Sequence, residues 1–126
     1  MDTLELDYQP PKAKVLVISD SLGTTASAVV DAAEAQFDKD LVDVVRLTRV
    51  RTIEEVEKFL DEQMESDRPM AVFHTIGTSA LRREVRDACE SRGIPSIDLM
   101  GPAITVLSGL TGVEPSEEVG ALRHRQ

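Results

Sequence analysis

The chain has 126 residues, a formal net charge of −9 at pH 7 and one cysteine. The acidic balance excludes nucleic acid and anionic membranes as expected partners. The single cysteine excludes an internal disulfide, and no pair of Cys or His residues has metal-site spacing, so no metal ligands are expected. Because no apolar run reaches membrane-spanning length and the first residues are acidic and polar, we expect a soluble, cytoplasmic protein without a signal peptide.

Apolar strands alternate with amphipathic helices along the chain. The predicted strands are Val15–Ser19, Val42–Leu47, Met70–His74 and Ser96–Leu99. The predicted helices are Thr25–Phe37, Thr52–Met64, Thr78–Arg92 and Pro102–Leu110. We expect one domain over residues 1–126, with residues 1–12 as a loose arm and residues 112–126 as a tail. The four strand–helix units predict a three-layer α/β domain of Rossmann-like or flavodoxin-like type, with a parallel sheet of order 2-1-3-4 and helices on both faces.

The helices carry more detailed expectations. The second begins with a capping box, in which Thr52 is the N-cap and Glu55 follows three residues later. Phe37 and Met64 close the apolar stripes of the first and second helices, so both are expected to face the core. The fourth helix has little polar face, which predicts burial by this domain or by a partner. His74, at the end of a buried strand, is expected to be a hydrogen-bonded structural histidine.

The loops that follow the strands gather at one edge of such a sheet, where ligands bind. Small hydroxyl residues and a glycine precede the first helix, and a helix start attracts anions. The candidate site residues for an anion or nucleotide are Ser19, Asp20, Ser21, Gly23, Thr24, Thr25, Arg46, Arg49, Thr75 and Gly101. Two alternatives stay open: an ordinary turn whose Ser and Thr cap the helix, and arginines paired with surface carboxylates.

Phosphate or an adenine nucleotide is the expected ligand, and no covalently bound cofactor is expected. Asp20 would repel an anion unless it turns away, pairs with an arginine or holds Mg²⁺, so a need for Mg²⁺ stays open. Flavin is not expected, since the chain has no Trp, one Tyr and three Phe. Neither the Rossmann glycine spacing nor a Gly-x-x-x-x-Gly-Lys-Ser/Thr loop occurs in the sequence.

The run Ser19-Asp20-Ser21-Leu22-Gly23-Thr24-Thr25-Ala26 resembles the opening signature of the pyruvate, phosphate dikinase and phosphoenolpyruvate synthase regulatory proteins, which are bifunctional kinase/phosphorylases. The likeness continues to His124 through Arg46-Leu47, Val72-Phe73-His74-Thr75, Gly93-Ile94-Pro95, Asp98-Leu99-Met100-Gly101-Pro102 and Glu114-Pro115-Ser116. The sequence departs from the family pattern at Leu22 and Thr24, where Thr and Glu are usual. It departs again at Gly77-Thr78-Ser79, which replaces a Val-Asp-Pro-like stretch.

The resemblance implies the amino-terminal regulatory or ligand-binding domain of a serine/threonine kinase and phosphorylase, without the domain that carries the catalytic phosphate loop. Family members move phosphate from ADP to a threonine of the dikinase and remove it with inorganic phosphate. We therefore expect this chain to hold no catalytic residues and to be inactive alone. Pyruvate, phosphate dikinase or phosphoenolpyruvate synthase is the implied partner, and a homodimer is expected. The alternatives are a stand-alone sensor of a phosphorylated metabolite and a structural dimerisation module.

Overall fold

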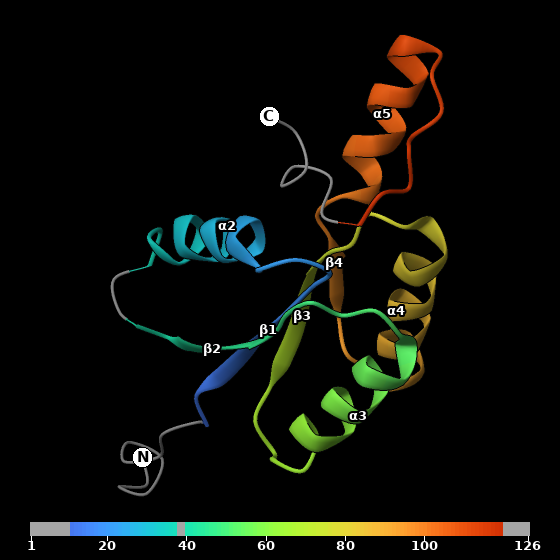
Figure 1. Cartoon of the computed structure of the whole chain (residues 1–126). Helices are drawn as coiled ribbons and strands as arrows, with labels where there is room; N and C mark the ends of the chain where they lie inside the picture. Colours follow the sequence, from blue (N-terminus) through green and yellow to red (C-terminus); the bar gives the residue numbers. More distant parts are fainter. Residues whose placement is uncertain (1–10, 38–39, 120–126) are drawn as a thin grey trace, which may run out of the picture.

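Four strands form one wholly parallel sheet in the computed structural model, which describes residues 11–37 and 40–119 (Figure 1). The strands are β1 (Ala13–Ser19), β2 (Val42–Leu47), β3 (Met70–Thr75) and β4 (Ser96–Asp98). Their order is β2-β1-β3-β4, which confirms the predicted topology. Because every strand is parallel to its neighbour, the loops after the strands all lie at the carboxyl edge of the sheet.

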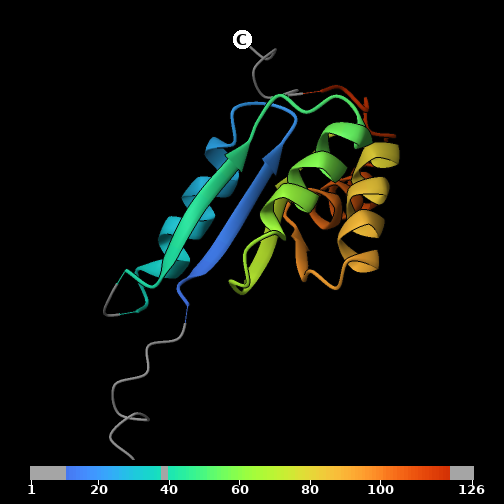
Figure 2. The ribbon, with the colours of Figure 1, turned by 90° about the horizontal axis from the view of Figure 1, so that it is seen from below.

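Helices cover both faces of this sheet, which confirms the three-layer prediction. The helices are α2 (Thr24–Glu34), α3 (Ile53–Gln63), α4 (Ser79–Ser91) and α5 (Gly101–Thr111). Figure 2 shows α2 against one face of the sheet and α3 with α4 against the other. No helix in the described ranges is both long and apolar enough to cross a membrane.

The central strand β1 supplies both halves of the core. Leu16 and Ile18 pack beneath α3 and α4, whereas Val15 and Val17 pack beneath α2 with Val30. This alternation follows from the two-residue period of a strand, and a strand buried on both sides must be apolar throughout. The run Val15–Ile18 therefore lies at the centre of the fold. Ser19 and Asp20 follow it at the carboxyl edge of the sheet.

The helix boundaries agree with the sequence except at the end of α2. The capping box of α3 is confirmed, since Thr52 Oγ1 accepts from the Glu55 N–H and Glu55 Oε1 accepts from the Thr52 N–H. However, α2 ends at Glu34, because the chain tightens into i to i+3 hydrogen bonds such as Phe37 N–H to Glu34 O. The inward placement of Phe37 is therefore wrong, and its residue is 61% exposed. Met64 follows the end of α3 and is also exposed.

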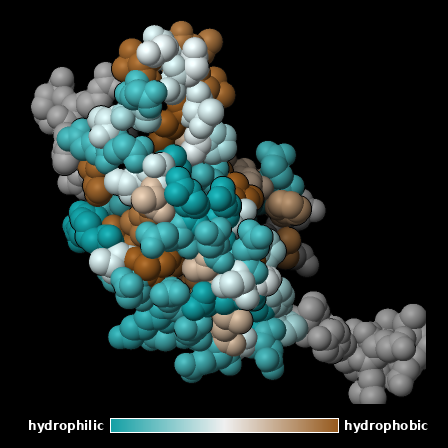
Figure 3. Space-filling view, turned by 90° about the vertical axis from the view of Figure 1, so that its right-hand side faces the viewer, coloured by the Kyte–Doolittle hydropathy of each residue, from teal (hydrophilic) through white to brown (hydrophobic). Residues whose placement is uncertain are grey.

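Helix α5 projects beyond the carboxyl edge of the sheet (Figure 1). Only its first residue, Gly101, is buried, and the exposed fraction is 60% for Val106 and for Leu107 and 78% for Leu110. Figure 3 shows hydrophobic residues gathered on this projecting part. Burial of this helix by the chain itself is thus not found among the described residues, and burial by a partner stays a prediction.

Candidate functional site

The loop between β1 and α2 is shaped by short side chains. Ser19 and Asp20 are buried at the end of β1, and Ser19 Oγ accepts a hydrogen bond from the Ser21 N–H at 3.0 Å. Gly23 has a φ of 79°, a left-handed conformation that residues with a Cβ rarely adopt. A Cβ there would lie 3.4 Å from a methyl group of Val17. The sharp turn at Gly23 therefore brings the start of α2 directly over the end of β1.

The start of α2 carries no side-chain cap and no acidic residue in its first turn. Its first intrahelical bond runs from the Ser27 N–H to the Gly23 carbonyl, so the N–H groups of Thr24, Thr25 and Ala26 precede the helical ladder. The three other helices begin differently. At the start of α3, the side chain of Thr52 accepts from the Glu55 N–H. At the start of α4, Glu117 accepts from the Ser79 N–H. At the start of α5, Asp98 accepts from the Met100 and Gly101 N–H groups. Among residues 11–37 and 40–119, no side chain accepts from these N–H groups of α2, which we call the unclaimed donors.

Asp20 connects three of the four loops at the carboxyl edge. Its residue is 5% exposed, and its Oδ2 accepts from the Gly77 N–H at 2.8 Å. Its backbone carbonyl accepts from Arg51 Nη1, also at 2.8 Å. One carboxylate oxygen is therefore committed to the start of α4, which turns part of the negative charge away from α2.

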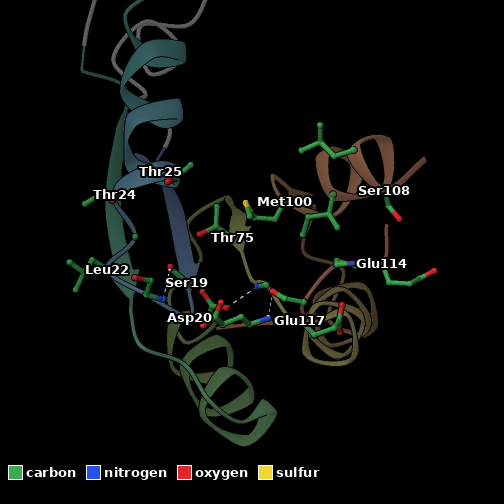
Figure 4. A pocket seen from close by; sticks show the side chains of 18 of the residues that line it. Ser19, Asp20, Leu22, Thr24, Thr25, Thr75, Met100, Ser108, Glu114 and Glu117 are labelled. Atoms are coloured by element: carbon green, nitrogen blue, oxygen red, sulfur yellow. Dashed lines mark hydrogen bonds between the residues drawn. The ribbon is translucent and has the colours of Figure 1, made fainter. Parts of the chain in front are cut away.

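A cavity of about 760 Å³ opens between this loop, helix α5 and the chain that follows α5 (Figure 4). The β1–α2 loop lines it with every residue from Ser19 to Thr25, and β3 contributes Thr75. Helix α5 and its approach supply the apolar wall with Met100, Ile104 and Leu107. Residues 113–118, which we call the strap, close the remaining side and add Glu114, Glu117 and Glu118.

The lining has an uneven charge. Hydroxyl groups and the unclaimed N–H groups of α2 offer donors on one wall, whereas the charged side chains that line the cavity among the described residues are all carboxylates. No lysine or arginine of the described residues lines the cavity. The arrangement can hold an anion through backbone and hydroxyl donors. The negative charges of Asp20 and of the strap glutamates would repel that anion.

The structure brings most of the predicted site residues together. Seven of them line the cavity: Ser19, Asp20, Ser21, Gly23, Thr24, Thr25 and Thr75. Arg46, Arg49 and Gly101 do not. Arg46 donates from Nε to Ser27 Oγ on the outer part of α2. Arg49, whose φ is 56°, is exposed and supports the loop through its own N–H, which donates to the Ser21 carbonyl.

Gly101 has a packing role instead. A Cβ at this position would overlap Asp98 Oδ2 and would lie 3.0 Å from Arg82 Nε. Asp98 and Arg82 form an ion pair, with 3.5 Å between Oδ2 and Nε, and Arg82 also donates to the Ile76 and Gly77 carbonyls. Only a glycine lets α5 begin so close to this pair.

Two titratable side chains lie in the core rather than in the cavity. His74 is 1% exposed, and neither ring nitrogen has a hydrogen-bond partner among the residues that the structure describes, so the expected hydrogen bond is not found there. Burial lowers the pKa of His74 below its usual value, which keeps the ring neutral. Burial raises the pKa of the Cys89 thiol to about 11, so Cys89 is an unreactive core residue.

Sequence reasoning missed the wall formed by α5 and the strap. The apolar residues of α5 were interpreted only as a surface for burial, and Glu114-Pro115-Ser116 only as part of a family likeness. The available signal was Gly112, whose φ of 69° ends α5 and lets the chain turn back toward the sheet. Within the described ranges no group of three or more His, Cys, Asp or Glu side chains is arranged for a metal ion.

Comparison with known proteins finds relatives over most of the chain. The family model described as kinase/pyrophosphorylase matches residues 15–126. A Bdellovibrio bacteriovorus protein is 33% identical over 109 residues, which are 86% of this chain and 38% of the relative. A Latilactobacillus sakei protein is 32% identical over 110 residues, 87% of this chain and 39% of the relative.

A Cutibacterium acnes protein is 35% identical over 104 residues, which are 80% of this chain and 35% of the relative. All three relatives are named as pyruvate, phosphate dikinase regulatory proteins. The chain spans less than two-fifths of the length of each of these curated relatives.

Proposed function

We propose that this chain, which belongs to the kinase/pyrophosphorylase family, is the ligand-binding amino-terminal part of a regulator of pyruvate, phosphate dikinase. Its ligand is phosphate or the phosphate group of an adenine nucleotide, bound in the cavity at the carboxyl edge of the sheet. The observation that carries the proposal is the uncapped start of α2, which opens onto this cavity through Gly23. The dikinase comes from the names of the relatives, and phosphoenolpyruvate synthase is the alternative target.

The donors at the start of α2 fit a phosphate group. Oriented N–H groups and the helix dipole favour negative charge at this point. Gly23 allows the ligand to approach the backbone, and the hydroxyl groups of Ser21, Thr24 and Thr25 can donate to phosphate oxygens. The alternative that these hydroxyl groups cap α2 finds no support in the structure, because no side chain in the described part of the chain caps this helix.

The carboxylates around the cavity limit the affinity. Asp20 and the three glutamates of the strap repel a free phosphate dianion at the same site. A Mg²⁺ complex of the ligand would reduce that repulsion. We therefore expect weak binding of free phosphate and tighter binding in the presence of Mg²⁺.

The proposal is tested by titrating phosphate and ADP into the chain by calorimetry, with and without Mg²⁺. Gly23→Val should weaken binding tenfold or more, which corresponds to about 1.4 kcal/mol, because the new side chain fills the approach to α2. Gly93→Val is the matched control. Gly93 has a similar φ of 69° with no neighbour within 4 Å, so it carries the same backbone strain at the end of α4.

Equal affinity in the Gly23→Val and Gly93→Val proteins would remove the β1–α2 loop from the binding site. The same conclusion would follow if the unmodified chain bound neither ligand at millimolar concentration. A stand-alone sensor of a phosphorylated metabolite would bind through the same loop, and it would be distinguished by the absence of an effect on the dikinase.

A second candidate function is supported by the exposed face of α5. Val106, Leu107 and Leu110 of α5, with Val113 at the start of the strap, are each at least 60% exposed, which is unusual for neighbouring apolar residues on a monomer. A structural module that joins two copies of the chain through α5 would bury this face. Sedimentation analysis at several concentrations distinguishes this candidate, since a ligand-binding monomer would show no concentration dependence.

A further inference from the structure

The strap is attached to the start of α4 by the side chain of Glu117. Glu117 Oε1 accepts from the Ser79 N–H at 2.8 Å and from Ser79 Oγ at 2.9 Å. The hydrogen bond from the Ser79 N–H has the largest effect in lowering the pKa of Glu117, and the bond from Ser79 Oγ lowers it further. The nearby charges of Arg82 and Arg83 act in the same direction. The charged carboxylate therefore occupies the helix start in the way that an external anion would.

The backbone of the strap also comes unusually close to the loop before α4. A Cβ on Gly77 would lie 2.7 Å from the Glu118 carbonyl oxygen, a distance that such atoms do not normally reach. Glu117 itself has a φ of 62°, which is uncommon for a residue with a side chain. The strap thus follows a path that requires a glycine beneath it and a strained residue within it.

The residues of the strap are exposed. Every residue from Val113 to Glu118 is exposed, and the hydrogen bonds of Ser108 with Val113 and of Ser116 with Glu118 join residues close in sequence. Segments with few buried contacts open at low free energy. The attachment of Glu117 to Ser79 joins residues 38 positions apart, so its loss should favour opening of the strap.

We propose that the strap is a gate over the cavity and that the contact between Glu117 and Ser79 is its latch. When the latch is closed, the strap forms one wall of the cavity and holds Glu114, Glu117 and Glu118 beside it. Opening widens the entrance and moves these negative charges away from the start of α2. The closed strap thus inhibits the binding of anions in the cavity. This inhibition rests on the proposed phosphate site, whereas the opening and closing of the gate does not.

Access to the cavity can be measured without any ligand. Thr75 lines the cavity and is 7% exposed, so the rate at which a thiol reagent labels a Thr75→Cys protein reports how often the gate is open. The native Cys89 gives little background, because its thiol is fully buried and its pKa is raised to about 11. All gate variants are made in this Thr75→Cys background.

Glu117→Ala should accelerate labelling several-fold, because both bonds to Ser79 are lost. Gly77→Ala should do the same without removing a charge, because its methyl group displaces the Glu118 carbonyl. Glu117→Gln keeps an oxygen acceptor and should lie between these variants and the parent. Glu114→Ala is the matched control, since Glu114 lines the cavity but does not contact Ser79, and it should label at the parent rate.

Phosphate titration of the same proteins completes the test. Opening the strap should raise phosphate affinity roughly threefold in Glu117→Ala and in Gly77→Ala, the size expected for removing screened charges about 10 Å away. Unchanged labelling in both variants overturns the gate. Faster labelling with unchanged or weaker phosphate binding overturns the autoinhibition. Faster labelling in proteins that bind no phosphate at all supports the gate and instead removes the proposed phosphate site.

Discussion

The carboxylate of Asp20 holds the end of β1 against the start of α4, since its Oδ2 accepts the Gly77 N–H at 2.8 Å. The two residues are 57 positions apart in sequence and follow neighbouring strands of the sheet. The bond joins the β1–α2 loop to the loop before α4, and both residues line the cavity. It also explains how an acidic residue can occupy a loop that we propose binds an anion.

Replacement of Asp20 separates its structural role from its charge. Asp20→Ala leaves the partly buried Gly77 N–H without its acceptor and should lower the free energy of unfolding by about 1–2 kcal/mol. Asp20→Asn retains an oxygen acceptor and should lose less stability, while its lost charge should strengthen phosphate binding. Urea denaturation and calorimetry on both proteins check this. Equal stability of the alanine and asparagine variants would show that the bond to Gly77 contributes nothing.

The start of α5 should be intolerant of a single methyl group. Gly101→Ala places a Cβ on Asp98 Oδ2 and against Arg82, so we expect a loss of about 1–3 kcal/mol in the free energy of unfolding. Gly109→Ala is the control in the same helix, because nothing lies within 4 Å of the new Cβ. It should be neutral or stabilise by up to about 1 kcal/mol through helix propensity. Denaturant unfolding should therefore give a lower free energy of unfolding for Gly101→Ala and an unchanged or higher one for Gly109→Ala.

The stability of the chain should depend on pH through His74. Burial lowers the pKa of the folded histidine below 6.5. The charges of Arg82 and Arg86 also lower this pKa, whereas the charge of Asp98 raises it. The unfolded chain therefore binds a proton at a pH where the folded chain does not. The free energy of unfolding should fall as pH decreases below about 6.5, by up to about 1.4 kcal/mol per pH unit.

His74→Leu should remove this contribution, so the difference between the pH profiles of the two proteins isolates it. Unfolding would be measured in urea between pH 5 and pH 8, where carboxylates contribute to both proteins alike. A difference curve that is flat below pH 6.5 would show that the folded and unfolded histidines have the same pKa.

A dimer formed through α5 should be disrupted by one charge. Leu110 is 78% exposed, so Leu110→Asp should leave the folded monomer unaffected while preventing association. Thr105→Asp, at another exposed position of the same helix, is the control. Sedimentation velocity gives the oligomeric state of each protein. A chain that is monomeric before substitution would remove the dimerisation candidate.

The chain alone should transfer no phosphate. Phosphoryl transfer needs a phosphate cradle and bound metal ions, and no Gly-x-x-x-x-Gly-Lys-Ser/Thr loop occurs in its 126 residues. Incubation with ADP and pyruvate, phosphate dikinase, followed by mass spectrometry of the dikinase, tests this. Phosphothreonine that depends on the purified chain would overturn the expectation.

The sequence by itself determined the topology and most of the predicted residues that line the cavity. Four apolar strands alternating with amphipathic helices leave few arrangements, because short right-handed connections force a parallel sheet. The same patterning placed the loops after β1 and β3 at one edge, so Ser19 to Thr25 and Thr75 were predicted together and lie together. The capping box of α3 was readable because its chemistry is local.

Only the tertiary structure decided which distant groups reach the cavity. Arg46 stands in register with Val17, so its side chain lies on the α2 face of the sheet and bonds Ser27 instead of a ligand. That outcome depends on the register between β1 and β2, because a shift of one residue exchanges the faces. The α5 wall and the strap depend likewise on how α5 leaves β4 and how Gly112 turns the chain back. Contacts such as that of Glu117 with Ser79 join segments far apart in sequence, and local patterns carry no information about their separation in space.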